Sequence, residues 1–89
     1  MAAFVYMLRC ENGSLYTGWT NDLQKRLARH QAGVGGKFTR AFKVVDMVYY
    51  EELASQHEAM QREYELKHLR KAQKELLVKN FQLNKEKSE

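Results

Sequence analysis

Two segments near the start of the chain have the residue pattern of β-strands. Residues 4–10 and 14–20 are rich in aromatic and β-branched residues and carry few charges, which is typical of strands in a folded sheet. Between them stand Glu11, Asn12 and Gly13, and an Asn-Gly pair between two such runs is a strong hairpin signal. The sequence therefore predicts that the chain opens with a β-hairpin.

The turn of this hairpin decides which side chains share a face of the sheet. A two-residue turn would send Tyr6 and Tyr16 to opposite faces. A three-residue loop with Gly13 in the left-handed conformation would set Leu8 opposite Tyr16, and both tyrosines would then be diagonal neighbours on one face. Periodicity alone leaves both registers open.

The middle of the chain alternates between helical and strand-like patterns. Leucines spaced four residues apart predict a helix over residues 23–32, which Asn21 or Asp22 can cap and a glycine-rich connection ends. One further turn of helix is expected within residues 37–42. The β-branched and aromatic run at residues 44–50 predicts a third strand.

The last part of the chain has two helical patterns. Ser55 and Glu58 form a capping box, which predicts the start of a helix over residues 56–68. A second apolar stripe predicts a helix over residues 72–81. The polar residues 84–89 are expected to form a disordered tail.

The order of these elements is ββαβαα, which indicates one α+β domain over residues 1–83. A chain of 89 residues with 44% hydrophobic and 29% charged residues has the composition of an ordinary globular protein with one core. No apolar run approaches the ~20 residues of a membrane helix, and no secretory signal is present, so we expect no membrane partner and a cytoplasmic location. The single cysteine, Cys10, cannot form an internal disulfide.

The net charge of +4 is unevenly distributed along the chain. Residues 1–45 carry seven Lys and Arg against two Asp and Glu, whereas residues 46–89 carry eight against nine. A basic cluster of this kind suits a partner with phosphate charges, and a solvated basic surface is the alternative interpretation. The cations expected to contact nucleic-acid phosphates are Lys25, Arg29, Lys37, Arg40 and Lys43.

Polar residues interrupt the apolar faces of two predicted helices. Arg26 and His30 stand on the same stripe as the leucines of the first helix. Glu63 shares a face with Ala59 and Leu66 of the helix over residues 56–68. A buried charge is unfavourable without a partner, so Glu63 could be the ion-pair partner of Arg26. Alternatively, the carboxylate holds a metal ion in a cleft where the arginine meets a phosphate.

Together these residues resemble the GIY-YIG nuclease superfamily. The motifs Val-Tyr-Met around Tyr6 and Tyr-Thr-Gly from Tyr16 have its ten-residue tyrosine spacing. Arg26 follows ten residues later, His30 stands four residues after it, and Glu63 lies on a predicted helix. The resemblance is closest to small stand-alone GIY-YIG proteins and to the catalytic domain of structure-specific flap and junction endonucleases.

The resemblance covers about residues 4–77 and implies a three-stranded antiparallel sheet flanked by helices. It also implies a cleft whose catalytic residues are Tyr6, Tyr16, Arg26, His30 and Glu63. Glu63 would hold one Mg²⁺ or Mn²⁺ ion and Arg26 a phosphate oxygen. Tyr16 would accept the proton of the attacking water, with a relay to His30, whose ordinary pKa of ~6.5 suits that task. Tyr6 would position the water or the phosphate.

A shared tyrosine site requires the three-residue hairpin loop, so we expect Gly13 at positive φ. This chain differs from one member of the superfamily at Trp19. The excision-repair incision subunit carries a lysine at that position. Trp19 could stack on an unpaired base or pack against the helices.

The function implied by the resemblance is a metal-dependent nuclease that hydrolyses DNA phosphodiester bonds in DNA repair or recombination. RNA is the alternative substrate. Two other functions are also compatible with the sequence: a non-catalytic nucleic-acid-binding module of the same fold, and a catalytic subunit that needs a protein partner.

Overall fold

The computed structural model describes residues 2–33 and 43–87 of the chain. Its strands and helices are β1 (Ala3–Cys10), β2 (Leu15–Thr20), α1 (Leu23–Gln31), β3 (Val44–Leu53), α3 (Gln56–Lys67) and α4 (Lys71–Lys87). The strands form an antiparallel sheet in the order β2-β1-β3, which confirms the predicted α+β fold. The expected turn of helix within residues 37–42 lies outside the described residues, as do Lys37 and Arg40.

The hairpin between β1 and β2 has the three-residue loop. The Cys10 N–H donates to the Ser14 carbonyl at 3.0 Å, and the Gly13 N–H donates to the Cys10 carbonyl at 2.9 Å. Gly13 has a φ of 85°, a conformation that glycine adopts without a steric penalty. Leu8 stands opposite Tyr16, so the predicted register is confirmed and both tyrosines share one face.

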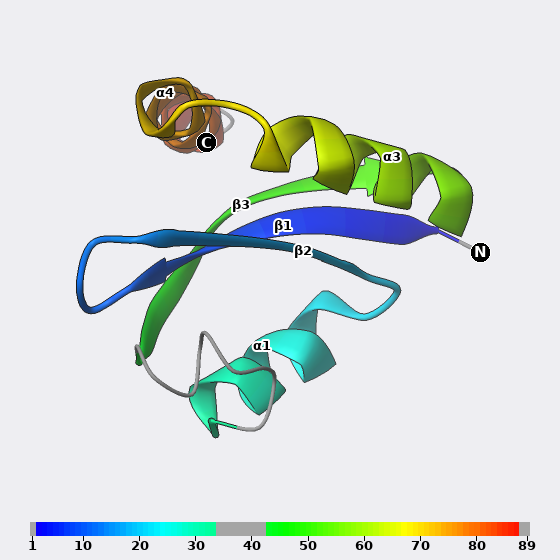
Figure 1. Cartoon of the computed structure of the whole chain (residues 1–89), viewed down its shortest axis with the longest axis horizontal. Coiled ribbons are helices and arrows are strands. Elements are labelled where there is room, and N and C mark those ends of the chain that lie inside the picture. Colours follow the sequence, from blue (N-terminus) through cyan, green and yellow to red (C-terminus); the bar gives the residue numbers. More distant parts are fainter. Residues whose placement is uncertain (1, 34–42, 88–89) are drawn as a thin grey trace.

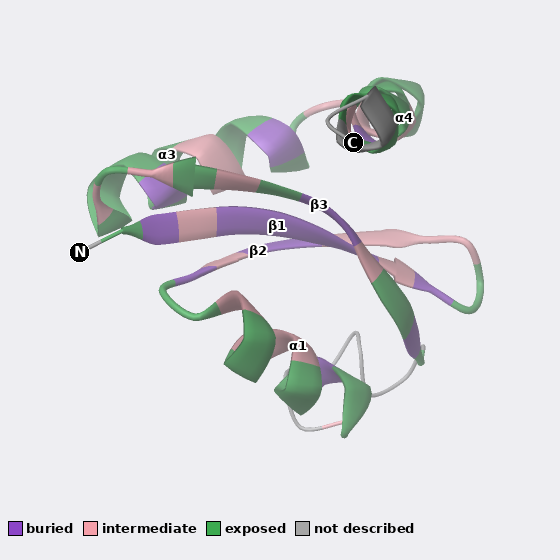
Figure 2. Ribbon diagram, turned by 180° about the vertical axis from the view of Figure 1, so that it is seen from behind, coloured by how far each residue is buried: buried purple, intermediate pink, exposed green. Residues whose placement is uncertain are grey.

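The helices cover the two faces of the sheet separately (Figure 1). Helix α1 lies against one face, and α3 and α4 lie against the other. Figure 2 shows that the central strand β1 is buried along most of its length. Because side chains alternate along a strand, β1 contributes to two cores. The core beside α1 contains Tyr6, Leu8, Cys10 and Val44. The core beneath α3 and α4 contains Val5, Met7, Val48, Tyr49, Leu66 and Val78.

Side-chain caps position the helices that carry the candidate site residues. The Asp22 carboxylate accepts a hydrogen bond from the Lys25 N–H at 3.1 Å, which satisfies one unpaired donor at the start of α1. The Ser55 hydroxyl accepts from the Glu58 N–H at 3.2 Å at the start of α3. Both starts agree with the sequence signals.

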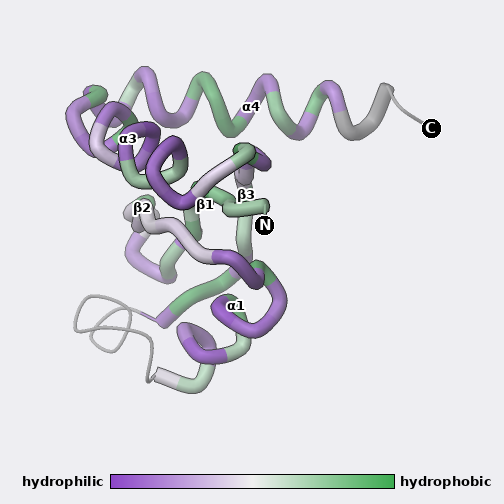
Figure 3. The backbone as a smooth tube through the Cα atoms, turned by 90° about the vertical axis from the view of Figure 1, so that its right-hand side faces the viewer, coloured by the Kyte–Doolittle hydropathy of each residue, from purple (hydrophilic) through white to green (hydrophobic). Residues whose placement is uncertain are grey.

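Helix α4 is longer than the sequence predicted. It runs to Lys87 rather than ending at residue 81, so residues 84–87 of the expected disordered tail are helical. The residues beyond Phe81 are mainly Gln, Leu, Lys and Glu, which are good helix formers, and the helix therefore continues past its packed part. Its last turns project beyond the sheet (Figure 3). None of the helices in the described residues is long and apolar enough to cross a membrane.

Candidate active site

A buried polar pair joins the centre of β1 to the last turn of α1. Tyr6 and His30 are each 1% exposed, and the Tyr6 hydroxyl lies 3.0 Å from His30 Nε2. A buried polar group is costly unless it is hydrogen-bonded, so this bond makes the two residues compatible with the core. The buried imidazole of His30 on the first helix therefore has a hydrogen-bond partner, the Tyr6 hydroxyl of β1.

Tyr16 of β2 completes a group of three rings on the α1 face. Its ring centroid lies 5.0 Å from that of His30 and 6.5 Å from that of Tyr6. These separations are typical of aromatic packing. Tyr16 is half-buried, unlike the other two, so it is the ring of this group that is more accessible from solvent.

Gly18 leaves the space that the Tyr6 hydroxyl occupies. The two residues are directly opposite each other in the hairpin. A Cβ on Gly18 would lie 2.6 Å from the Tyr6 hydroxyl oxygen and 3.3 Å from the Tyr16 ring, which is too close for either ring to stay in place. Sequence reasoning did not include Gly18 among the site residues, although its position two residues after Tyr16 and the hairpin register together identify it.

The electrostatics around Tyr6 and His30 set the charge of each ring at neutral pH. Burial raises the pKa of the Tyr6 phenol well above its usual range, Tyr16 and Glu63 raise it further, and Arg26 lowers it. Burial also lowers the pKa of His30, and the charges of Arg26 and Arg29 act in the same direction. At neutral pH the phenol is therefore protonated and the imidazole is neutral. Both rings are therefore uncharged partners in their hydrogen bond, and His30 does not have the ordinary pKa assumed from the sequence.

Arg26 lies between the ring group and a pocket at the start of α1. This pocket has a volume of about 270 Å³ and is lined by Thr20, Asn21, Asp22, Lys25, Arg26 and Arg29. The same guanidinium is close enough to Tyr6 and His30 to shift both of their pKa values. A phosphate that entered the pocket would meet three cationic side chains, one of which also reaches the rings.

Glu63 reaches the site from α3. Its side chain is 23% exposed and pairs with Lys67 at 3.6 Å. Within residues 2–33 and 43–87, no ion pair joins Glu63 to Arg26, so the structure does not support the structural ion pair considered from the sequence. Both residues instead act on the same phenol, Tyr6.

The donor set fits one hard divalent ion held mainly by water. No group of three or more His, Cys, Asp or Glu side chains that could hold a metal occurs in the described part of the chain. Mg²⁺ is commonly held by one or two carboxylates, with waters and substrate phosphates completing its octahedral shell. The partly exposed Glu63 carboxylate is an oxygen ligand of this type, and it would exchange its contact with Lys67 for the ion.

The remaining predicted residues lie in different places. Trp19 is half-buried opposite Val5, which puts it on the α3 face, away from Tyr6 and Tyr16. Lys43 stands beside the hairpin loop, where its carbonyl accepts from the Glu11 N–H at 2.8 Å. Three of the residues expected to contact phosphates are described by the structure. Lys25 and Arg29 adjoin the site, whereas Lys43 lies at the other end of the sheet.

Comparisons with known proteins show the family to which the chain belongs. The sequence pattern of the GIY-YIG catalytic domain matches residues 2–76. A UPF0213 protein of Bacillus pumilus is 46% identical over 83 residues, which is 93% of this chain and 85% of the relative. A UPF0213 protein of Halobacterium salinarum is 48% identical over 73 residues, which is 82% of this chain and 95% of that protein.

Two solution NMR structures are also similar. The UPF0213 protein of Bacillus halodurans shares 43% sequence identity, with a TM-score of 0.55 over 89% of this chain and 84% of its own. A protein of E. faecalis shares 35% identity, with a TM-score of 0.61 over 93% of this chain and 88% of its own. The chain belongs to the GIY-YIG catalytic domain family, among the small stand-alone proteins named UPF0213.

Proposed function

We propose that the protein is a metal-dependent endonuclease that hydrolyses phosphodiester bonds of DNA, in repair or recombination. The observation that carries this proposal is the group of Tyr6, Tyr16 and His30 beside the cationic pocket of Arg26. The charges of Arg26 and Glu63, from separate helices, both act on Tyr6. These two charged groups are not paired with each other and are both partly exposed. A guanidinium can hold a phosphate oxygen, and a carboxylate can hold the cation that accompanies it.

The ring group divides the proton chemistry between its two tyrosines. Tyr6 holds its proton firmly, because burial raises its pKa, and its hydrogen bond to His30 fixes the position of the ring. It is therefore a poor base and suits a positioning role toward the phosphate or the water. Tyr16, half-buried at 5.0 Å from the His30 ring, is the better placed acceptor for the proton of the attacking water.

Glu63 and Arg26 provide the groups for charge stabilisation. Glu63 would hold the Mg²⁺ or Mn²⁺ ion, which would supply electrostatic stabilisation of the phosphate and the leaving oxygen. Arg26 binds a non-bridging oxygen, and Lys25 and Arg29 hold neighbouring backbone phosphates at the start of α1.

A cleavage assay tests this function directly. Purified protein is incubated with labelled single-stranded, flap, junction and duplex DNA and with single-stranded RNA, in Mg²⁺, in Mn²⁺ or with chelator. We expect metal-dependent cleavage of at least one DNA substrate. Tyr16→Phe should lower the rate by ~10²-fold or more, since it removes a proton acceptor.

Tyr64→Phe is the matched control, because Tyr64 is a 66% exposed tyrosine of α3 that lies outside the ring group. It should cut at the wild-type rate. Binding of DNA without cleavage, with every substrate and metal, would instead establish a non-catalytic binding module. Cleavage that begins only on addition of a protein partner would establish the subunit alternative.

A further inference from the structure

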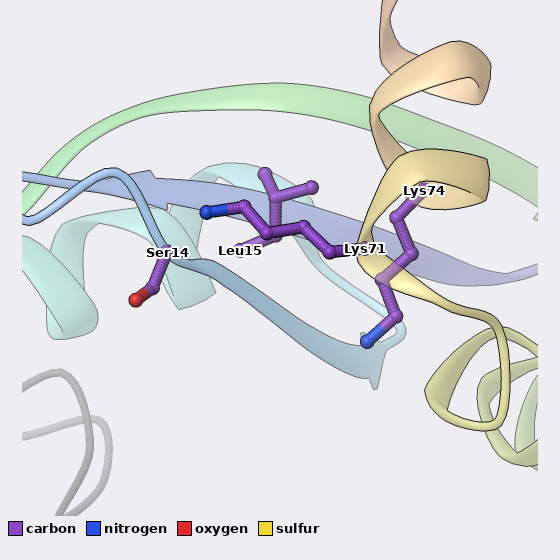
Figure 4. Close-up of a pocket in the computed structure, with 4 residues that line it drawn as sticks. All are labelled: Ser14, Leu15, Lys71 and Lys74. Atoms are coloured by element: carbon purple, nitrogen blue, oxygen red, sulfur yellow. The ribbon is translucent and has the colours of Figure 1, made fainter.

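A second pocket with two lysines lies between β2 and the start of α4. It has a volume of about 250 Å³ and is lined by Ser14, Leu15, Lys71 and Lys74. Figure 4 shows Lys71 reaching from the first turn of α4 toward Ser14 and Leu15. The pocket is formed by segments far apart in the sequence, so the fold brings the two ammonium groups to the edge strand of the sheet.

The positive charge of this pocket is only partly balanced by the protein. The first turn of α4 contains no acidic residue, and the positive end of the helix dipole is unfavourable for lysines. No ion pair with an acidic side chain involves Lys71 or Lys74 within the described residues. The charge of Lys71 helps to lower the pKa of Glu75, but Arg9 is the main cause, and both carboxylate oxygens of Glu75 bind Arg9 at 2.5 Å. Two like charges at an unfavourable helix end, beside one carboxylate that is already engaged, favour an anionic ligand.

The pocket lies on a route that starts at the candidate active site. Strand β2 leads from Gly18 and Tyr16 to Ser14. The two residues from Tyr16 to Ser14 span ~7 Å of extended chain, which is the rise of about two base pairs at ~3.4 Å each. Lys67, 51% exposed and 3.6 Å from Glu63, stands at the end of α3, just before the loop that leads to Lys71.

We propose that the pocket of Ser14, Lys71 and Lys74 is a second phosphate-binding site, which holds the backbone of the same nucleic-acid strand at the opposite end of β2 from the phosphate at Arg26. This inference rests on the proposed function. The strand runs along the outer edge of β2, past Lys67, and its backbone is gripped at both ends of that edge. Phosphate contacts of this kind fix the register of the strand without reading its bases.

Binding to single strands of increasing length tests the site without cleavage. Fluorescence anisotropy is measured in chelator for wild type and for Lys71→Gln/Lys74→Gln with labelled strands of two to twelve nucleotides. The double variant should bind the longest strands about five- to tenfold more weakly, whereas binding of dinucleotides should not change. The salt dependence of log K should fall by about 0.7 for each phosphate contact that is lost.

Lys79→Glu is the matched control, because it changes the net charge by the same two units at an exposed position of α4 outside the pocket. It should weaken binding of long strands much less than the double variant. Equal effects of the two variants would overturn the proposal, because net charge alone would then explain the binding. Thermal melts of both variants establish that each is folded.

Two further outcomes separate this site from the nuclease function. If the wild-type protein binds long strands through Lys71 and Lys74 but never cleaves them, the proposed function is overturned and the second site stands. Cleavage by wild type, with no effect of the double variant on long strands, would overturn the second site alone. A hexaglutamate peptide is the competing ligand: if the double variant lost only peptide binding, the pocket would be a site for acidic peptides instead.

Discussion

The two faces of the sheet bury different kinds of side chain. Beneath α3 and α4, the core is built mainly from aliphatic residues such as Val5, Leu66 and Val78. Beside α1, the core includes the hydrogen-bonded pair of Tyr6 and His30. The same central strand supplies both cores. The difference shows that one face holds the domain together, while the other gives up apolar packing to keep titratable groups in place.

Each face also has a buried tyrosine with a raised pKa, so a raised pKa does not by itself mark the functional face. Burial, with the Glu51 carboxylate that accepts its hydrogen bond, raises the pKa of Tyr49 to about 12. Glu51 also binds Arg62 at 3.1 Å, which closes that cluster on itself. Arg26 and Glu63, which act on Tyr6, are not paired with each other. Glu63 has only a partly exposed contact with Lys67, which an ion can replace.

Neutralising one acid that acts on each of the two tyrosines, Tyr6 and Tyr49, should separate their roles most clearly. Glu63→Gln should lower single-turnover cleavage by ~10³-fold or more, because a bound metal supplies several kcal/mol of stabilisation. Its metal-free stability should change by less than ~0.5 kcal/mol, since only a partly exposed pair with Lys67 is lost. Thermal melts and cleavage in saturating Mg²⁺ measure both quantities.

Glu51→Gln should do the reverse. It should cost ~1–2 kcal/mol of stability, because it weakens the bonds to Tyr49 and Arg62, and it should leave cleavage by the folded protein unchanged. A Glu63→Gln protein that melted far lower and still cut at the wild-type rate would remove Glu63 from the site and return it to a structural role.

Gly18→Ala should have the next largest effect. It changes the packing of side chains on the α1 face without changing any charge. The added methyl group would lie 2.6 Å from the Tyr6 hydroxyl and displace the ring. Cleavage should fall by ~10²-fold, as expected when a site is displaced by about 1 Å, and stability should fall by ~1–3 kcal/mol. Normal cleavage by a folded Gly18→Ala protein would show that the Tyr6 position is not critical.

The buried histidine should make stability depend on pH. Because folding lowers the pKa of His30, the unfolded chain binds a proton that the folded protein resists. The stability from neutral His30 is present above the ordinary pKa of 6.5 and is lost as pH falls below it, by less than ~1.4 kcal/mol per pH unit for one proton. Urea titrations between pH 8 and 5 should show this loss in wild type and in the exposed control His57→Gln, but not in His30→Gln.

The smallest expected effect is on the α3 face, where Thr17 is 4% exposed and its hydroxyl has no hydrogen-bond partner among the residues that the structure describes. Thr17→Val keeps the shape and removes a buried polar group, so it should stabilise the protein by ~1 kcal/mol. Cleavage should be unaffected. Chemical denaturation measures the gain, and a loss of stability would mean that the hydroxyl has a role that the packing does not reveal.

Local sequence signals predicted most of the fold. The Asn-Gly loop, the caps at Asp22 and Ser55, and the leucine spacing each involve residues within a few positions of one another, so short-range chemistry determines them. The end of α4 was placed too early, because the polar face of a helix-forming segment resembles that of a flexible tail.

The candidate site was harder to predict, because its contacts join distant segments. The spacing of Tyr6, Tyr16 and Arg26 indicated which residues belong to the site, but not that Tyr6 is hydrogen-bonded to His30. The pocket between β2 and α4 was not predicted either, since nothing in the sequence places Lys71 beside Ser14. Pairings of this kind depend on how helices pack on the sheet, and single-sequence periodicity does not contain that information.

The bond between Arg9 and Glu75 has a consequence for the order in which the protein assembles. It joins β1 to α4 across 66 positions of sequence, so the chain entropy lost in forming it is large compared with that of the hairpin. Helix α4 should therefore dock after the sheet has formed and should open first, as one unit, in hydrogen exchange. A nucleic-acid strand held by Lys71 and Lys74 would bind only the docked state, and it would slow exchange along the whole helix.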